Sequence, residues 1–316
     1  MKRFTIALAA AGLFGSVVAA HAADWQPPGP ITLMIGFQAG GGADTQARLI
    51  AEELEKRHGW KFIPQQVTGK GGSNLARKLK SEPADGTAIG IVVSETFTYN
   101  MMAARDPGYS ADDFTYLTST AGSQMGVMAR SDSPFKSFGD VVSAARAGKP
   151  VKFGAMSAKL ADGAYLLGRS QGVEFNTVML KGGKAVLDAL IAGDIDIGWG
   201  AGIQAKAVRA GDVLNLVSGE NERLAVSPDA PTTKEIGVDY SFGALFMFAA
   251  PAGLPADAAR ALSAAIAEVV NDPGSKARAF IDKGFGGPKV IVGDDLRQFV
   301  VDDAAAAKRL LAESSK

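Results

Sequence analysis

The chain has 316 residues, 33 basic and 33 acidic side chains, two histidines and no cysteine. This length is enough for two domains of ordinary size. The missing cysteines exclude disulfides, a thiol nucleophile and zinc thiolates. The balanced charge, with no Lys/Arg cluster, argues against a nucleic-acid partner.

The first 22 residues predict an export signal. Lys2 and Arg3 precede an apolar run over residues 4–20, and the sequence AHA follows at residues 20–22. This order is typical of a cleaved secretory signal peptide. A membrane anchor is the alternative, but the run is short and rich in Gly and Ala. We therefore expect a mature chain that starts near Ala23 and lies in the periplasm.

Removal of this segment would leave His58 as the single histidine. It lies just before Gly59, at the end of a predicted helix, where the helix dipole favours a basic side chain. One histidine cannot build a multi-histidine metal site. A Ser-His-Asp mechanism would have to use His58, away from every glycine-rich loop. We therefore expect no metal, no cofactor and no enzyme.

The first part of the mature chain predicts alternating strands and helices. Residues 30–37 form a nearly all-apolar run, typical of a buried parallel strand. The next helix ends at Gly59 and places its apolar residues on one face: Ala47, Ile50, Ala51 and Leu54. Residues 61–67 predict a second strand, in which Pro64 favours a sheet edge or a break. A glycine loop with a helix (69–83) and a third strand (84–95) complete a βαβαβ unit.

The same order recurs further along. We predict strands over 149–158, 174–180, 194–201 and 213–219, with helices over 161–172 and 184–193. Residues 244–251 predict a strand that returns to the first unit, and 255–272 a helix. The fold class is therefore α/β: two doubly wound lobes joined by two crossover strands near residues 121 and 249. We expect lobe 1 to comprise 23–121 plus 249–316, and lobe 2 to comprise 122–248.

Glycine loops follow several predicted strands. Gly40, Gly41 and Gly42 allow a close backbone approach, and Asp44 is the expected N-cap of the following helix. Free amides and the helix dipole would favour an anion there. The loop fits neither the Walker nor the G-x-G-x-x-G pattern. A turn that only joins a strand to a helix remains the alternative.

Other strand ends carry polar or flexible residues: Ser94, Glu95 and Thr96; Ser157 and Lys159; Lys181, Gly182 and Gly183; and Gly200, with Asp196 within the same strand. Doubly wound sheets bind ligands at the carboxyl ends of their strands, so these loops would face one cleft between hinged lobes. Each loop taken singly fits a plain connection as well. Trp199 fits the core or a ligand platform, and Lys184 with Asp188 fits an exposed pair.

These motifs together resemble the substrate-binding proteins of tripartite tricarboxylate transporters, the Bug family. The quoted segments are PITLMIGFQAGGGADTQARLIAEEL, with Gly36 where a proline is usual, then GKGGSN, PADGTAIGI, LKGGKAVLDALIAGDIDI, LAVSPDAPTTKEIGV and PAGLP. Their order and spacing cover nearly all of the mature chain. The resemblance implies a Venus-flytrap protein of the type-II periplasmic binding-protein fold that holds a small carboxylate.

The resemblance also implies site residues. Phe37, Ala39, Gly40, Gly41 and Asp44 match the family's first loop, and Ser94 and Thr96 match the hydroxyl residues after the third strand. The second lobe contributes Lys181, Gly182, Gly183 and Asp196.

One loop departs from the family pattern. The family's S-S-G-x-G-S-x-x-H is replaced by AMSAKLADGAY, which keeps Ser157 and adds Lys159. As a hypothesis, Lys159 pairs with a ligand carboxylate.

Three functions follow from these patterns. The first is a solute-binding protein that delivers a small organic acid to membrane transporter subunits, and we expect it to be a monomer. The second is a ligand sensor for a receptor. The third is a secreted lyase or hydrolase on the same scaffold, in which Glu95 and Asp196 would be the acid–base pair.

Overall fold

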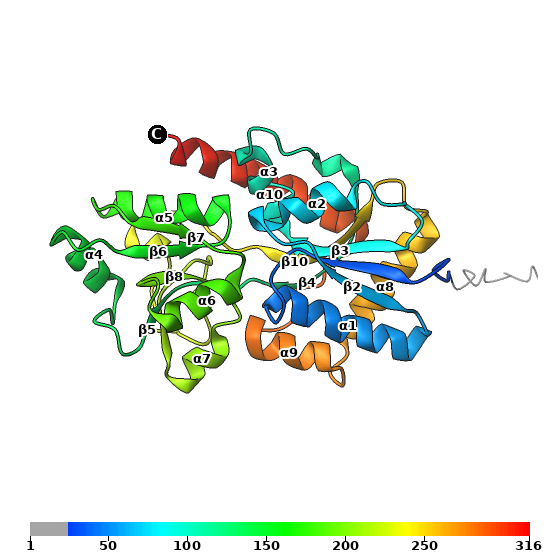
Figure 1. The fold of residues 1–316 in the computed structure, drawn as a ribbon, viewed down its shortest axis with the longest axis horizontal. Helices are drawn as coiled ribbons and strands as arrows, with labels where there is room; N and C mark the ends of the chain where they lie inside the picture. The colour runs from blue at the N-terminus through cyan, green and yellow to red at the C-terminus, as the bar shows by residue number, and fades with distance from the viewer. Residues whose placement is uncertain (1–24) are drawn as a thin grey trace, which may run out of the picture.

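The computed structural model describes residues 25–316 and contains two five-stranded sheets, each flanked by helices (Figure 1). The predicted signal peptide lies outside the described residues. The two sheets form two lobes that lie side by side, which confirms the predicted α/β class with two lobes.

The first sheet has the order β2-β1-β3-β10-β4. Its strands are β1 (Ile31–Ile35), β2 (Phe62–Gln66), β3 (Ala88–Val93), β4 (Phe114–Gly122) and β10 (Leu245–Pro251). β1 pairs in parallel with β2 and β3, as the βαβαβ pattern predicts, and β10 runs antiparallel between β3 and β4. β2 lies at the edge of the sheet, as Pro64 predicts.

Helices cover both faces of this sheet. They are α1 (Gly42–His58), α2 (Ser73–Leu79), α3 (Tyr99–Ala103), α8 (Ala256–Asn271), α9 (Lys276–Phe285) and α10 (Gly293–Ser314), with short 3-10 turns η1 (Lys70–Gly72), η2 (Ser94–Thr96) and η3 (Ala111–Asp113). Side chains of β1 alternate between two cores: Leu33 packs with α1, α8 and α9, whereas Met34 packs with α2 and α10. The predicted apolar face of α1 is buried, and Gly59 ends the helix in a left-handed conformation.

The second sheet has the order β7-β6-β8-β5-β9. Its elements are β5 (Met125–Arg130), α4 (Phe138–Arg146), β6 (Lys152–Ala155), α5 (Ala158–Ser170), β7 (Asn176–Met179), α6 (Gly183–Ala192), β8 (Ile197–Ala201), α7 (Ala205–Ala210), β9 (Val213–Ser218) and the 3-10 turn η4 (Lys234–Ile236). Trp199 is fully buried, and its indole N–H donates to the carbonyl of Leu160 at 2.8 Å. Of the two roles predicted for Trp199, the core position is therefore confirmed.

The chain passes between the sheets at two places. The first is the link from β4 to β5 at Ser123 and Gln124. The second lies between Phe242, which packs in the core of the second sheet, and Ala244, which packs in the core of the first.

The long helix α10 also joins the two sheets, because its Leu296 packs with the first and its Leu310 with the second (Figure 1). The sequence interpretation did not include this helix. α10 is therefore a further connection between the sheets, beside the two chain crossings.

Candidate functional site

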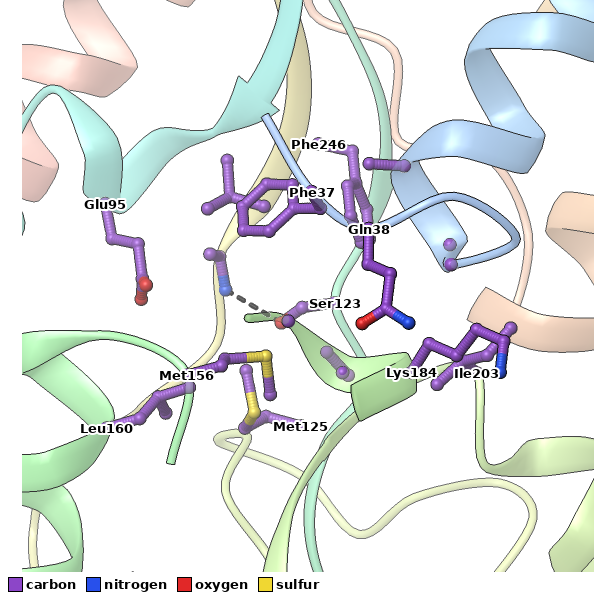
Figure 2. Close-up of a pocket in the computed structure, with 18 residues that line it drawn as sticks. Phe37, Gln38, Glu95, Ser123, Met125, Met156, Leu160, Lys184, Ile203 and Phe246 are labelled. Carbon is purple, nitrogen blue, oxygen red and sulfur yellow. Dashed lines mark hydrogen bonds between the residues drawn. The ribbon is translucent and has the colours of Figure 1, made fainter. Parts of the chain in front are cut away.

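A cavity lies between the two sheets, at the carboxyl ends of their parallel strands (Figure 2). Both lobes contribute to its lining: Phe37, Gln38, Gly41, Gly42, Ala43, Val93, Glu95, Ser123, Met125, Met156, Leu160, Gly182, Gly183, Lys184, Ala201, Ile203, Ala244 and Phe246. Its volume is about 40 Å³, which is room for about three water molecules. A larger ligand does not fit into the cavity with the lobes as the structure has them.

The start of α1 forms one wall of the cavity. Gly41 is the N-cap residue and no side chain caps this end, so the prediction that Asp44 is the N-cap is wrong. Asp44 instead lies in the first turn, and its carboxylate accepts a hydrogen bond from the Gly40 amide at 2.8 Å. The same carboxylate also binds Arg48 and Gln66. Asp44 therefore holds the glycine loop through the Gly40 amide and does not line the cavity.

The start of α6 forms the facing wall. Its N-cap is Gly182, with φ of 124°, and again no side chain caps the helix. Few residues other than glycine adopt that backbone conformation. The Gly182 backbone approaches Phe37 so closely that an added Cβ would lie 3.5 Å from its ring. The first amides of a helix have no partner within the helix, so α1 and α6 each present unpaired N–H groups and a positive dipole end to the same space.

The loop after β3 contributes a buried acid. Glu95 is 3% exposed and lines the cavity. Burial raises its pKa above 4.5, although the charge of Lys159, the nearby Ser157 hydroxyl and a hydrogen bond from Asn100 favour the ionised form. Its neighbours Ser94 and Thr96 have other partners: the Ser94 hydroxyl accepts from the Leu245 amide at 3.3 Å, and the Thr96 hydroxyl donates to the Gly71 carbonyl at 2.8 Å.

The loop after β6 differs from the expectation. Ser157 is the N-cap of α5 and accepts from the Leu160 amide at 3.3 Å. The helix therefore begins at Ala158, and Lys159 lies in its first turn instead of in a loop. The Lys159 ammonium donates to the Gly243 carbonyl at 2.8 Å. Neither residue is among those that line the cavity.

The structure brings some predicted site residues together and leaves others apart. Phe37, Gly41, Gly182 and Gly183 line one cavity. Ala39, Gly40 and Lys181 are exposed beside it. Asp196 lies just before β8, at the opposite end of that strand from Ala201, and accepts a hydrogen bond from the Lys152 amide at 2.9 Å. Asp196 and Glu95 are therefore not an acid–base pair across the cavity.

Sequence reasoning missed the apolar walls. Met125, Met156, Leu160, Ile203 and Phe246 line the cavity. In sequence they read as ordinary core positions of strands and helices, so no local signal marks them. Gln38 also lines the cavity, and its position next to the glycine loop could have indicated it. Ser123 lies where the chain passes between lobes, and its hydroxyl accepts from the Ala244 amide at 2.9 Å (Figure 2).

Two searches of residues 25–316 bear on function. That part of the chain contains no group of three or more His, Asp or Glu side chains arranged to hold a metal ion. Within the same range, no helix combines the length and the apolar character that crossing a bilayer requires.

Comparison with known proteins gave a family and several relatives. The model of the tripartite tricarboxylate transporter family receptor, TctC, matches residues 46–315. A UPF0065 protein from the gbd 5' region of Cupriavidus necator is 28% identical over 263 residues, 80% of this chain and 78% of its own length. Protein BugT of Bordetella pertussis is 24% identical over 94% of this chain and 93% of its own.

Solved structures share the fold. A Rhodopseudomonas palustris protein with adipate has a TM-score of 0.81 and 24% identity, covering 92% of this chain and 98% of its own. MatC from the same organism, with bound malate, has a TM-score of 0.79 and 24% identity, covering 90% of this chain and 99% of its own. The periplasmic binding protein BugD has a TM-score of 0.81 and 20% identity, over 92% and 99%.

Proposed function

Because the chain belongs to the tripartite tricarboxylate transporter receptor family, we propose that it captures a small carboxylate between its lobes and delivers it to a membrane transporter of that type. Receptors of this family are periplasmic solute-binding proteins. The observation that carries the proposal is the meeting of two uncapped helix ends, α1 and α6, at one cavity.

Anion capture follows from the chemistry of these ends. After Gly41 and Gly182, the first amides of α1 and α6 have no side-chain cap at the cavity. Charge-assisted hydrogen bonds from such amides are stronger than neutral ones. Lys184 adds a positive charge at the same end of the cavity. The adipate and malate in two structures of similar fold support a carboxylate as the ligand class.

The two facing ends also suggest how capture works. We divide the lobes near residues 122 and 243–249, so that α1 belongs to lobe 1 and α6 to lobe 2. A ligand that contacts both ends favours the closed arrangement over the open one. The carboxylate is released chemically unchanged. The signal peptide expected over residues 1–22 would place the mature chain in the periplasm.

A thermal-shift screen with mono-, di- and tricarboxylates, aromatic acids and amino acids tests the binding proposal. A cognate ligand should raise the melting temperature in proportion to the logarithm of its concentration. It should also reduce the radius of gyration in small-angle scattering, because the lobes close. Turnover of that ligand by the purified protein would overturn the proposal in favour of an enzyme.

Delivery needs a separate test in cells. Deletion of the gene for this chain should abolish uptake of the labelled ligand. The transcriptional response of the cells to intracellular ligand should remain intact. Normal uptake with a lost response would favour a sensor instead.

A further inference from the structure

One oxygen of Glu95 has no partner in the described part of the protein. Its Oε1 accepts a hydrogen bond from the Asn100 side chain at 3.3 Å. Its Oε2 is buried and accepts none. A buried polar atom without a partner costs about 1–3 kcal/mol and more for a charged group. Since this side chain lines the cavity, a ligand is the natural partner for Oε2.

Neighbouring polar groups do not fill that role. The Lys159 ammonium donates to the Gly243 carbonyl, and the Ser157 hydroxyl, which accepts from the Leu160 amide, lies near Glu95 without a hydrogen bond to its Oε2. Both still favour an ionised Glu95, whereas Asp303 on α10 disfavours it. Glu95 therefore lies in the cavity wall, and its Oε2 has no hydrogen-bond partner among the described residues.

The cavity has two chemically different ends. Figure 2 shows Glu95 on the opposite side from Gln38 and Lys184. Met125, Met156 and Phe246 form apolar walls between them. One end thus offers amide donors and a cation, and the other offers a carboxylate acceptor. A second carboxylate on the ligand would face Glu95, and two such groups at close range disfavour each other's ionisation.

We infer that the ligand is a short monocarboxylate whose far end carries an N–H donor, an amino or amide group, which Glu95 Oε2 accepts. This inference rests on the proposed function, because it takes the carboxylate to lie at the starts of α1 and α6. It narrows the ligand class from organic acids in general to amino or amide acids.

Isothermal titration with four probes of similar length tests it: 4-aminobutyrate, succinamate, succinate and butyrate. Either nitrogen-bearing probe should bind at least about tenfold more tightly than succinate and butyrate, because a site built around a polar group rejects analogues that leave it unpaired. Tightest binding by succinate would overturn this inference and leave the proposed function standing. No binding by any of the four probes would also overturn this inference, and the thermal-shift screen then decides the proposed function separately.

The Glu95→Gln variant links the preference to this side chain. Its preference for 4-aminobutyrate over butyrate should fall to below about threefold, since the charged acceptor is lost. Circular dichroism and a melting curve establish that the variant is folded. An unchanged preference in the folded variant would overturn the inference.

A second measurement uses the unmodified protein. Affinity for 4-aminobutyrate should rise as the pH is raised above 4.5, because the Glu95 carboxyl of raised pKa ionises, while affinity for butyrate changes little. The charged or titratable groups around it are Lys159 on α5, Asp303 on α10 and Tyr99 on α3. An affinity for 4-aminobutyrate that falls over this range would contradict the assignment.

Discussion

Three helices begin at strand ends that face the gap between the lobes, and they begin in two different ways. α1 and α6 start at Gly41 and Gly182 with no side-chain cap. α5 starts at Ser157, whose hydroxyl accepts the amide of Leu160. A capped helix end has already satisfied one of its free donors. The uncapped starts of α1 and α6 therefore keep their first amides free for a ligand, whereas the cap at Ser157 stabilises α5.

A side-chain cap at the start of α1 should have the largest effect on ligand binding. Gly41 has extended backbone angles, φ −79° and ψ 177°, which suit an N-cap aspartate. In Gly41→Asp the new carboxylate would bind the helix amides and repel a ligand anion. We expect affinity for the tightest of the four probes to fall at least about 100-fold, or about 2.7 kcal/mol.

Gly41→Ala is the matched control for that variant. Its Cβ meets the same obstacle, the Gln38 carbonyl at 3.0 Å, but carries no charge. Titration should show a loss below about tenfold for this variant, less than one step of 1.4 kcal/mol. Equal losses in the two variants would mean that crowding, and not occupation of the helix end, controls binding.

The first sheet could be predicted well because its signals are local. The apolar run of β1, the one-sided stripe of α1 and the left-handed Gly59 each need only neighbours in sequence. The start of α1 was misplaced because three glycines in succession permit several starting points. Asp44 still binds the loop, through the Gly40 amide, but from inside the first turn.

The cavity could be predicted only in part, since its walls depend on contacts distant in sequence. Met125 and Phe246 belong to strands of different sheets and meet only because the chain passes twice between the lobes. Lys159 was predicted in a loop, yet the Ser157 cap places it in a helix, and the Gly243 carbonyl, distant in sequence, accepts a hydrogen bond from its ammonium. The docking of α10 on both cores likewise has no local signal.

The pH dependence of stability tests the buried acid that faces the start of α5. Burial raises the pKa of Glu95 above its ordinary value of 4.5. Its contribution to stability is therefore full below about pH 4.5 and is lost as the pH rises through the folded-state pKa. Each unit of raised pKa weakens the fold by about 1.4 kcal/mol at higher pH. Glu95→Gln should consequently be more stable than the unmodified protein at pH 8, and the difference should disappear near pH 4.

Urea unfolding at several pH values measures this effect. Glu174→Gln is the control, because Glu174 is exposed and its replacement should leave the pH profile unchanged. A Glu95→Gln protein that is less stable than the unmodified one at pH 8 would show that Lys159 and Ser157 hold Glu95 ionised, contrary to the raised pKa.

Removal of the α5 cap tests how much the Ser157 hydroxyl stabilises the fold. Ser157→Ala should lower the free energy of unfolding by about 1 kcal/mol, as for other N-cap replacements. Ser137→Ala is its counterpart, because Ser137 caps α4 in the same lobe and accepts from the Asp140 amide at 3.2 Å. Urea titration should give similar losses for the two variants. A much larger loss for Ser157→Ala would assign its hydroxyl a role beyond the cap.

The smallest expected effect distinguishes two lysines at the start of α6. Lys184 lines the cavity, although it also pairs with Asp188 at 2.6 Å, whereas Lys181 is exposed and does not line it. Lys184→Gln should weaken binding of the tightest probe by about threefold, because a partly exposed charge near an anion contributes less than about 1 kcal/mol. Added salt should shrink that difference by screening the charge. Lys181→Gln should leave the affinity unchanged in the same titration. A larger loss for Lys181→Gln than for Lys184→Gln would support the reading of Lys181 as a ligand contact and would require the loop before α6 to fold inward when ligand binds.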